Sequence, residues 1–196
     1  QTIVNTRVGN AVGDYDEMGD NDIPEKATGR DFEVPGTMAE SWGYSQLDTP
    51  PYWRSSTRLI RHLIDIASKG GNYVLNIGPD GDGAVPQPAQ ERLADFAEWM
   101  KVNSESIYGT SASSLRRPEW GRFTQRANTL YAHVFDWPDN ELLLSVDGSF
   151  VQKIELLTAS GPKSLRWTAS NGASVLVTLP PMPPNRFSSV LRVTLK

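Results

Sequence analysis

Cysteine is absent from this chain of 196 residues, and histidine occurs only twice, at His62 and His133. The first absence excludes disulfide bonds, thiolate zinc sites and a cysteine nucleophile. Two histidines this far apart in the sequence do not indicate a metal site. Since no Walker, Rossmann or G-x-S-x-G pattern is present either, we expect neither a metal ion nor another cofactor.

Long apolar runs and clusters of basic residues are also lacking. No segment approaches the about 18 consecutive apolar residues of a transmembrane helix, and no charged segment of the kind that opens a signal peptide precedes the apolar TIVN stretch. The 19 Lys and Arg residues are outnumbered by 23 Asp and Glu, which gives a net charge of -4. We therefore expect no membrane association and no nucleic-acid partner. The absence of cysteine leaves the compartment open.

The first half of the chain alternates between strand-like and helical patterns. Apolar residues recur every three or four positions in Ser56–Lys69, and Gly70 and Gly71 provide a natural helix stop. The short apolar run Asn72–Ile77 lies next to these glycines and predicts a fully buried strand. The other predicted elements are strands at Thr2–Arg7 and Phe32–Gly43 and a helix at Pro88–Asn103. This order favours parallel strands with covered faces, which is an α/β fold.

A long polar segment, Val8–Asp31, separates the first two predicted strands. It contains four Gly, one Pro and seven Asp or Glu residues, and it shows almost no periodicity. Loops of more than about 20 residues in compact domains are usually functional or disordered. We interpret this one as functional.

Beyond Thr110 the pattern changes to short strand-like runs. Turn sequences such as Pro-Asp-Asn, Asp-Gly, Gly-Pro and Asn-Gly separate these runs at intervals of about 8–12 residues. Such spacing is typical of an antiparallel β-sandwich. With Ser111–Arg117 as the linker, we predict an α/β domain over residues 1–112 and a β-sandwich domain over residues 113–196.

Six segments, in chain order, carry the most specific signal. They are NTRVG at Asn5–Gly9, GDYDEMGDNDIPE at Gly13–Glu25, FEVPGTMAESWGY at Phe32–Tyr44, LIRHLIDIASKGGN, NYVLNIGPDGDG, and EWMKVNSESIYGT at Glu98–Thr110. Together they resemble the retaining α-L-fucosidases of glycoside hydrolase family 29, and the later VFDWPDNELLL and LPPMPPN are similar to the sandwich of these enzymes. The resemblance covers essentially the whole chain. It implies the C-terminal part of a (β/α)8-like barrel followed by an all-β antiparallel sandwich.

The same resemblance implies a retaining exo-α-L-fucosidase that acts on fucosylated oligosaccharides or glycoconjugates. Such glycosidases use two carboxyl groups about 5–5.5 Å apart, one as nucleophile and one as general acid and then base. In the family the nucleophile is an aspartate on an earlier barrel strand, and nothing in this chain matches it. We expect the N-terminal half of the barrel as a further partner, either as a separate chain or as an N-terminal portion, and we expect this chain alone to be inactive.

The resemblance assigns the general acid/base to Glu33. Its family counterpart is the Glu of a Trp-Glu pair, which here is Phe32-Glu33, so an apolar ring still neighbours the carboxyl group. Other branches take the acid from the preceding loop, which makes Glu17 the rival and Asp20 and Glu25 weaker candidates. The alternative for each is a solvated surface acid, as most Asp and Glu residues are.

Two further residues match positions that hold the sugar in the family. Arg7 matches an arginine that reaches the fucose ring, where its fixed cation can hold the nucleophile ionised and donate to a hydroxyl group. Trp42 of SWGY matches an aromatic residue that lines the pocket for the fucose methyl group. A structural ion pair and a Trp in the barrel core are the corresponding alternatives.

Two other classes of function are consistent with the sequence. A catalytically incomplete fragment, or a carbohydrate-binding module, would bind sugar without hydrolysis and would account for the unmatched nucleophile. A structural or protein-interaction domain is supported only by the general fact that β-sandwiches often bind partners. For the compartment, the resemblance favours a secreted, periplasmic or lysosomal location.

Overall fold

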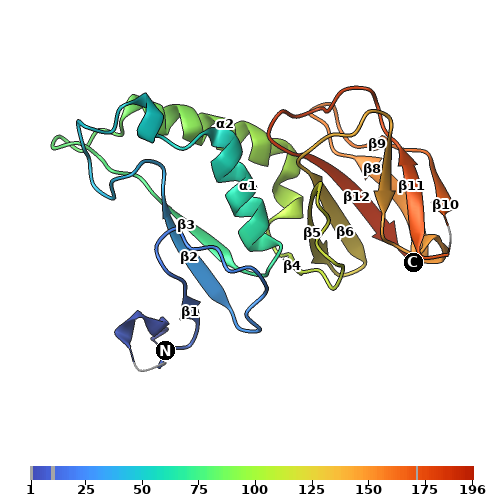
Figure 1. Cartoon of the computed structure of the whole chain (residues 1–196), viewed down its shortest axis with the longest axis horizontal. Helices are drawn as coiled ribbons and strands as arrows, with labels where there is room; N and C mark the ends of the chain where they lie inside the picture. The colour runs from blue at the N-terminus through green and yellow to red at the C-terminus, as the bar shows by residue number, and fades with distance from the viewer. Residues whose placement is uncertain (1, 10–11, 171) are drawn as a thin grey trace. The chain divides into compact units, whose positions relative to one another are not determined.

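The computed structural model describes residues 2–9, 12–170 and 172–196. The chain divides into two compact units, Gln1–Ala97 and Glu98–Lys196, which Figure 1 colours from blue to green and from green to red. The domain boundary predicted between residues 112 and 113 falls within the second unit and stays a prediction. No helix in the described part of the chain is long and apolar enough to cross a membrane.

Three parallel strands form the sheet of the first unit. They are β1 (Asp16–Glu17), β2 (Phe32–Thr37) and β3 (Asn72–Asn76), in the order β1-β2-β3. Glu33 of β2 lies opposite Glu17 of β1 and opposite Asn72 of β3. The parallel pairing confirms the α/β pattern predicted for this half of the chain.

The predicted strand Thr2–Arg7 is wrong. Thr6–Val8 form a 3-10 helix, η1, and only Asn5 pairs with the sheet, through a parallel bridge to Tyr15. The Asn5 side chain accepts a hydrogen bond from the backbone N–H of Arg7, which caps the turn and favours a helical path after Asn5. The long loop that follows contains β1, which was missed because Asp and Glu are rare in strands.

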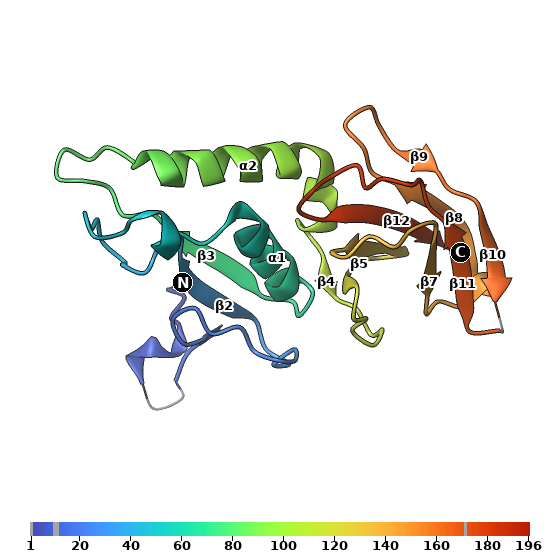
Figure 2. The same ribbon diagram turned by 45° about the horizontal axis from the view of Figure 1, so that its top comes forward.

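One α-helix follows β2 and another follows β3, the second continuing past Ala97. They are α1 (Ser56–Ala67), preceded by the 3-10 helix η2 (Pro50–Tyr52), and α2 (Gln87–Asn103). The Ser55 side chain caps the start of α1, and Gly70 adopts a φ of 83° after its end. Figure 2 shows α1 beside the sheet, and Ile66 of α1 packs with Phe32 of β2. The amphipathic helix expected here is therefore confirmed.

Strand β3 is not the fully buried strand that the sequence predicted. Val74 at its centre is 48% exposed, whereas Val34 of β2 has no exposed surface. The reason is that Val74 pairs with Pro35 and so lies on the sheet face opposite to Val34, whose face is covered by Ile66 of α1. Gly71, just before β3, is required by the Phe32 ring, with which any side chain at this position would collide.

Two antiparallel sheets build the second unit, with the orders β4-β5-β6-β12-β8-β9 and β10-β11-β7 (Figures 1 and 2). The strands and 3-10 helices are η3 (Ser104–Ser106), β4 (Ser111–Ala112), β5 (Gly121–Arg126), β6 (Thr129–Val134), β7 (Glu141–Leu144), η4 (Gly148–Phe150), β8 (Val151–Leu156), β9 (Lys163–Ser164), β10 (Trp167–Ser170), β11 (Ser174–Thr178) and β12 (Ser189–Leu195). Leu144 and Val177 from the smaller sheet share one buried core with Leu191 from the larger. This shared core confirms the predicted β-sandwich.

The predicted linker Ser111–Arg117 is wrong in its first two residues. Ser111 and Ala112 form β4 and pair with Gln125 and Thr124 of β5. Strand β4 forms because its backbone pairs with β5 at the sheet edge. A Ser- and Arg-rich sequence does not indicate such pairing.

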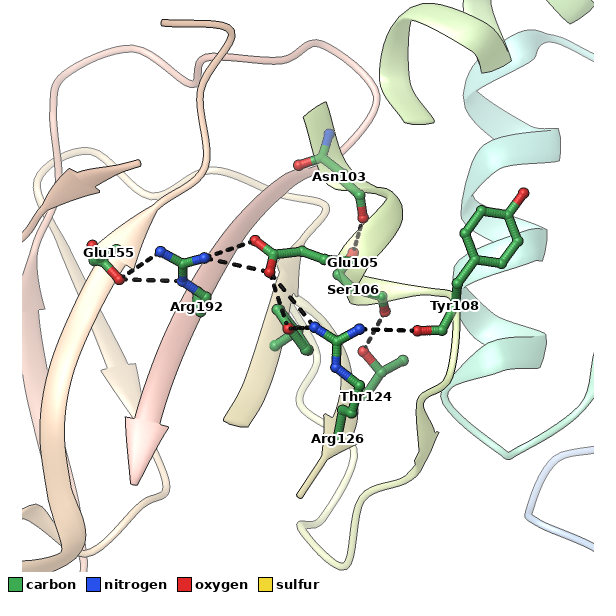
Figure 3. Close-up of polar contacts among 9 residues, drawn as sticks. Asn103, Glu105, Ser106, Tyr108, Thr124, Arg126, Glu155 and Arg192 are labelled. Atoms are coloured by element: carbon green, nitrogen blue, oxygen red, sulfur yellow. Dashed lines mark hydrogen bonds and ion pairs between the residues drawn. The ribbon is translucent and has the colours of Figure 1, made fainter. Parts of the chain in front are cut away.

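A polar network ties η3 to the sandwich (Figure 3). Arg192 of β12 donates to Glu105 at 3.0 Å and to Glu155 of β8 at 2.9 Å. Thr124 donates to the backbone carbonyl of Ser106 at 2.6 Å. These bonds fix the segment that follows α2 to strands β5 and β12, and Arg192 also joins β12 to β8.

Candidate active site

The two predicted acid/base candidates lie side by side on neighbouring strands. Glu17 is the last residue of β1 and is paired in register with Glu33 of β2. Side chains of directly paired residues point to the same face of a sheet. The structure therefore brings together the preferred candidate and its rival.

Asn5 and Tyr15 connect these carboxyl groups. The Asn5 amide nitrogen donates to Glu17 Oε2 and lies 3.4 Å from Glu33 Oε1. The Tyr15 hydroxyl donates to the same Glu33 oxygen at 3.2 Å. Partial burial raises the pKa of Tyr15, and the hydrogen bond to Glu33 raises it further, so the phenol remains a hydrogen-bond donor at neutral pH.

Arg7 makes ion pairs with two acids of the loop. Its Nε lies 2.8 Å from Glu17 Oε1, and its Nη2 contacts Asp20. The hydrogen bond and the charge of Asp20, followed by the charge of Glu17, raise the pKa of Arg7 above its ordinary value. The Arg7 side chain is 58% exposed and that of Glu17 is 8% exposed, so the guanidinium covers the more buried acid.

The remaining candidates lie apart from this cluster. Trp42 is 41% exposed, and its backbone carbonyl accepts a hydrogen bond from the Asn76 side chain at 2.6 Å. Within residues 2–9, 12–170 and 172–196, no hydrogen bond or ion pair joins Trp42 or Glu25 to the two carboxyl groups. Asp20 joins the cluster through its ion pair with Arg7.

An open cavity of about 570 Å³ adjoins Glu33. Tyr15, Phe32 and Asn72 line it together with Glu33. Phe32 contributes only backbone, since it has no exposed surface, and the exposed apolar side chain on the wall is that of Ile3. The walls thus combine an aliphatic side chain, a phenol, an amide and a carboxyl group, which suits a ligand with both hydroxyl groups and apolar carbon. In the described part of the chain, no group of three or more His, Asp or Glu residues could hold a metal ion.

Sequence reasoning missed Asn5 and Tyr15 as site residues. Both belong to segments that carry the family resemblance, NTRVG and GDYDEMGDNDIPE, yet neither side chain is of a type that signals catalysis. The bridge between Asn5 and Tyr15 is what brings them to Glu33.

Comparison with known families decides the classification. A family model described as alpha-L-fucosidase matches residues 1–105, and one described as alpha-L-fucosidase C-terminal domain matches residues 118–196. The chain belongs to the α-L-fucosidase family. Tissue alpha-L-fucosidase of Mus musculus is 31% identical over 208 residues, and this match covers 100% of the chain and 45% of the mouse protein. For alpha-L-fucosidase of Dictyostelium discoideum, the identity is 30%, with 83% of the chain and 37% of that protein covered.

Solved fucosidase structures extend the similarity to the fold. Alpha-L-fucosidase isoenzyme 1 from Paenibacillus thiaminolyticus superposes with a TM-score of 0.91 at 28% identity, covering 100% of this chain and 50% of that one. The enzyme of Vibrio sp. strain EJY3 gives 0.87 at 29% identity, with 99% and 36% covered. These similarities confirm the predicted family and fold class. The chain spans about half or less of the length of these relatives.

Proposed function

We propose that this chain supplies the C-terminal part of a retaining exo-α-L-fucosidase that hydrolyses terminal α-L-fucosyl linkages of fucosylated glycans. The observation that carries this proposal is the pairing of Glu17 and Glu33, held by Asn5, Tyr15 and Arg7, in a chain of the fucosidase family. A solved Thermotoga maritima α-fucosidase in complex with fucose, 26% identical to this chain with a TM-score of 0.82, supports the substrate class.

Glu33 is the general acid/base in this proposal. A general acid must carry a proton when the glycosidic bond breaks. Among the described contacts, Glu33 accepts hydrogen bonds from the neutral groups of Tyr15 and Asn5, whereas Glu17 is ion-paired with Arg7. Both oxygens of Glu17 are contacted by donors, Oε1 by Arg7 and Oε2 by Asn5, so Glu33 is the carboxyl group that is better placed to reach a substrate.

The nucleophile in this proposal is an aspartate on a barrel segment outside this chain. The chain covers 45% of the mouse relative, which leaves room in that relative for the remaining strands. Among the described strands β3 pairs only with β2, and its unpaired edge supports a partner that continues the sheet. Analytical ultracentrifugation of the native protein is expected to find this chain joined to further barrel sequence. A lone, monodisperse monomer of 21.7 kDa would contradict that arrangement.

Arg7 and Trp42 are the proposed sugar-binding residues. Arg7 is exposed enough to donate to a ring hydroxyl while it pairs with Glu17. The ring of Trp42 would cover the fucose methyl group, whose burial contributes about 1 kcal/mol.

The test is a matched pair of substitutions, Glu33→Gln and Glu17→Gln, in the full-length protein. Loss of the acid slows hydrolysis of natural glycans, which have poor leaving groups, and spares activated aryl α-L-fucosides. Azide is expected to restore the turnover that Glu33→Gln removes in the second step. NMR of the first product should show retained configuration, and an inverted product would rule out double displacement. Full activity of Glu33→Gln on natural glycans would exclude Glu33 from this role.

The second candidate function is sugar binding without hydrolysis by this chain as an incomplete fragment. The cavity beside Glu33 favours it, because its walls need no further segment to contact a sugar. Calorimetric titration of the isolated chain with L-fucose measures binding, and incubation of the same chain with an aryl α-L-fucoside measures turnover. Binding without release of the aryl group supports the fragment, and release of the aryl group excludes it.

A further inference from the structure

The loop that carries Trp42 makes few hydrogen bonds of its own. Among the described residues, no backbone group of residues 40–44 has a recorded hydrogen bond to another backbone group. The hydrogen bond recorded for Trp42 in this part of the chain is at its backbone carbonyl, and its ring is 41% exposed with the rest of the residue. A ring that is to cover the fucose methyl group must keep one position, so its anchor has to come from another element.

Asn76, the last residue of β3, supplies this anchor. Its side-chain amide donates to the Trp42 carbonyl at 2.6 Å. Asn72, four residues earlier on β3, is the residue that pairs with Glu33 of β2. Every second residue of a strand faces the same side, so Asn76 lies on the face that Asn72 shares with Glu33. Trp42 is thus tied to the carboxyl-bearing face of the sheet, at the carboxyl end of β3, where parallel sheets bind their ligands.

A close backbone contact holds the same loop a second time. Gly78 follows β3, and a Cβ atom placed on it would lie 2.7 Å from the carbonyl carbon of Gly43 and 2.9 Å from the backbone nitrogen of Tyr44. Such distances are too short for a side chain, so the two loops can pack main chain against main chain because residue 78 is glycine. The segment after β3 therefore holds the Trp42 loop both by an amide and by its shape.

We propose that Asn76 and Gly78 are positioning residues that hold the ring of Trp42 against the C5 methyl group of fucose and so set the preference for this sugar. This inference rests on the proposed fucosidase function and on the role of Trp42 within it. Asn76 acts through the Trp42 carbonyl and not by contact with the sugar. The inference gives a function to the NYVLNIGPDGDG segment, which contains none of the proposed catalytic or sugar-binding residues.

The experiment compares kcat/KM in the full-length protein for an aryl α-L-fucoside and for its analogue with hydrogen in place of the C5 methyl group. Burial of a methyl group against a ring corresponds to a preference of about fivefold for the fucoside. Trp42→Ala should abolish this preference. Asn76→Ala should lower it by about two- to threefold, because a hydrogen bond that orders the loop is lost. In the Trp42→Ala background, Asn76→Ala should lower it no further.

Glycine substitutions test the backbone contact in the same assay. Gly78→Ala should lower the preference for the fucoside, because the new side chain displaces the Trp42 loop. Gly81→Ala is the matched control, since an added Cβ atom on this neighbouring glycine meets no atom within 4 Å, and it should keep the preference of the parent protein. Asn128→Ala, at an exposed asparagine of the second unit, is the corresponding control for Asn76→Ala.

The ratio of the two substrates distinguishes positioning from a merely structural role. A structural loss lowers the activity on both substrates alike and leaves their ratio unchanged. An unchanged ratio in Asn76→Ala, or an equal drop with and without the Trp42 ring, would overturn the inference. Where Gly78→Ala fails to fold, Asn76→Ala still decides. An inactive parent protein would overturn the proposed function itself, whereas an active parent whose ratio survives Trp42→Ala would overturn this inference alone, together with the role of Trp42.

Discussion

Nε of Arg7 and Oε1 of Glu17 are 2.8 Å apart, which links a residue predicted to hold the sugar to a residue predicted as a rival acid. The pair bears on two alternatives that the sequence left open: a structural ion pair for Arg7, and a solvated surface acid for Glu17. Arg7 takes part in a structural ion pair and remains 58% exposed, so the pairing leaves it free to donate to a ligand. Glu17 is 8% exposed and has its charge compensated, which is unlike a solvated surface acid.

Arg7→Gln should reduce kcat/KM of the full-length protein for aryl α-L-fucosides by about 100-fold, because it removes a fixed positive charge beside the reacting groups. Steady-state kinetics with a thermal unfolding scan on the same preparation measure the effect. Arg30→Gln is the matched control, since it removes the 2.9 Å ion pair with Asp16 from the same sheet without touching Glu17. A similar loss in both variants would show that Arg7 matters only through the stability of the sheet.

The sequence predicted the elements with strong local signals. The amphipathic pattern and the glycines after α1 predicted the position of this helix. The turn residues between the sandwich strands predicted the sandwich. The β1 strand could not be predicted, since its two acidic residues are stabilised by pairing with β2 and not by their own propensity. The Thr2–Arg7 error has the same origin, because a cap by the Asn5 side chain outweighs an apolar run.

The candidate site was predictable only in part. Glu33, Glu17 and Arg7 have residue types that indicate catalysis and lie in segments with family resemblance. Asn5 and Tyr15 acquire their roles from a single bridge between distant residues, which spacing along the chain does not encode. The exposure of Val74 likewise depends on which face of the sheet a helix covers, a property of the folded unit.

Leu144→Ala should lower the free energy of unfolding of the second unit by about 3–5 kcal/mol, because it opens a cavity in the shared sandwich core. Leu143→Ala is the matched control, since the adjacent side chain on β7 is 52% exposed, and its cost should stay near 0.5 kcal/mol. Urea denaturation with hydrogen exchange at the β7 and β11 amides measures both. Equal losses would contradict the assigned face of β7.

Arg192→Met should lower the free energy of unfolding of the second unit by about 2 kcal/mol, because it leaves Glu105 and Glu155 without their shared cation (Figure 3). Lys153→Met is the control. Lys153 also pairs with Glu155, but it is 52% exposed, so its loss should cost under about 1 kcal/mol. A larger effect in Lys153→Met than in Arg192→Met would contradict the central place of Arg192.

The same network makes a pH prediction. Burial acts to raise the pKa of Glu155, but hydrogen bonds from Lys153 and Arg192 together with their charges leave it below the ordinary 4.5. A depressed carboxyl pKa contributes stability above the unfolded value and loses it as the pH falls. The wild type should therefore lose more stability than Arg192→Met when the pH is lowered from about 5 to 3. Acid titrations of both proteins, monitored by circular dichroism, measure this difference. Equal loss of stability with pH in the two proteins would show that the network is unimportant.

His133 should make the second unit sensitive to mild acid. Its ring has no exposed surface, and Nε2 lies 3.0 Å from the Thr124 hydroxyl. That hydroxyl donates its hydrogen to the carbonyl of Ser106, so Nε2 must be the protonated nitrogen, and Nδ1 has no partner among the described residues. Burial lowers the pKa of His133 from 6.5 to about 3, since a second proton would place an uncompensated charge in the core.

The sign follows from the two states. The unfolded chain takes up a proton near the ordinary histidine pKa of about 6.5, and the folded chain does not, so the stability is complete above that pH and falls below it. The slope approaches about 1.4 kcal/mol per pH unit between roughly pH 6 and 3. His133→Gln should reduce this slope in urea denaturation measured at several pH values, whereas His62→Gln should change it less, because His62 is only partly buried. An unchanged slope in His133→Gln would mean that the imidazole gains a proton in the folded state, which contradicts the buried neutral tautomer deduced from Thr124 and Ser106.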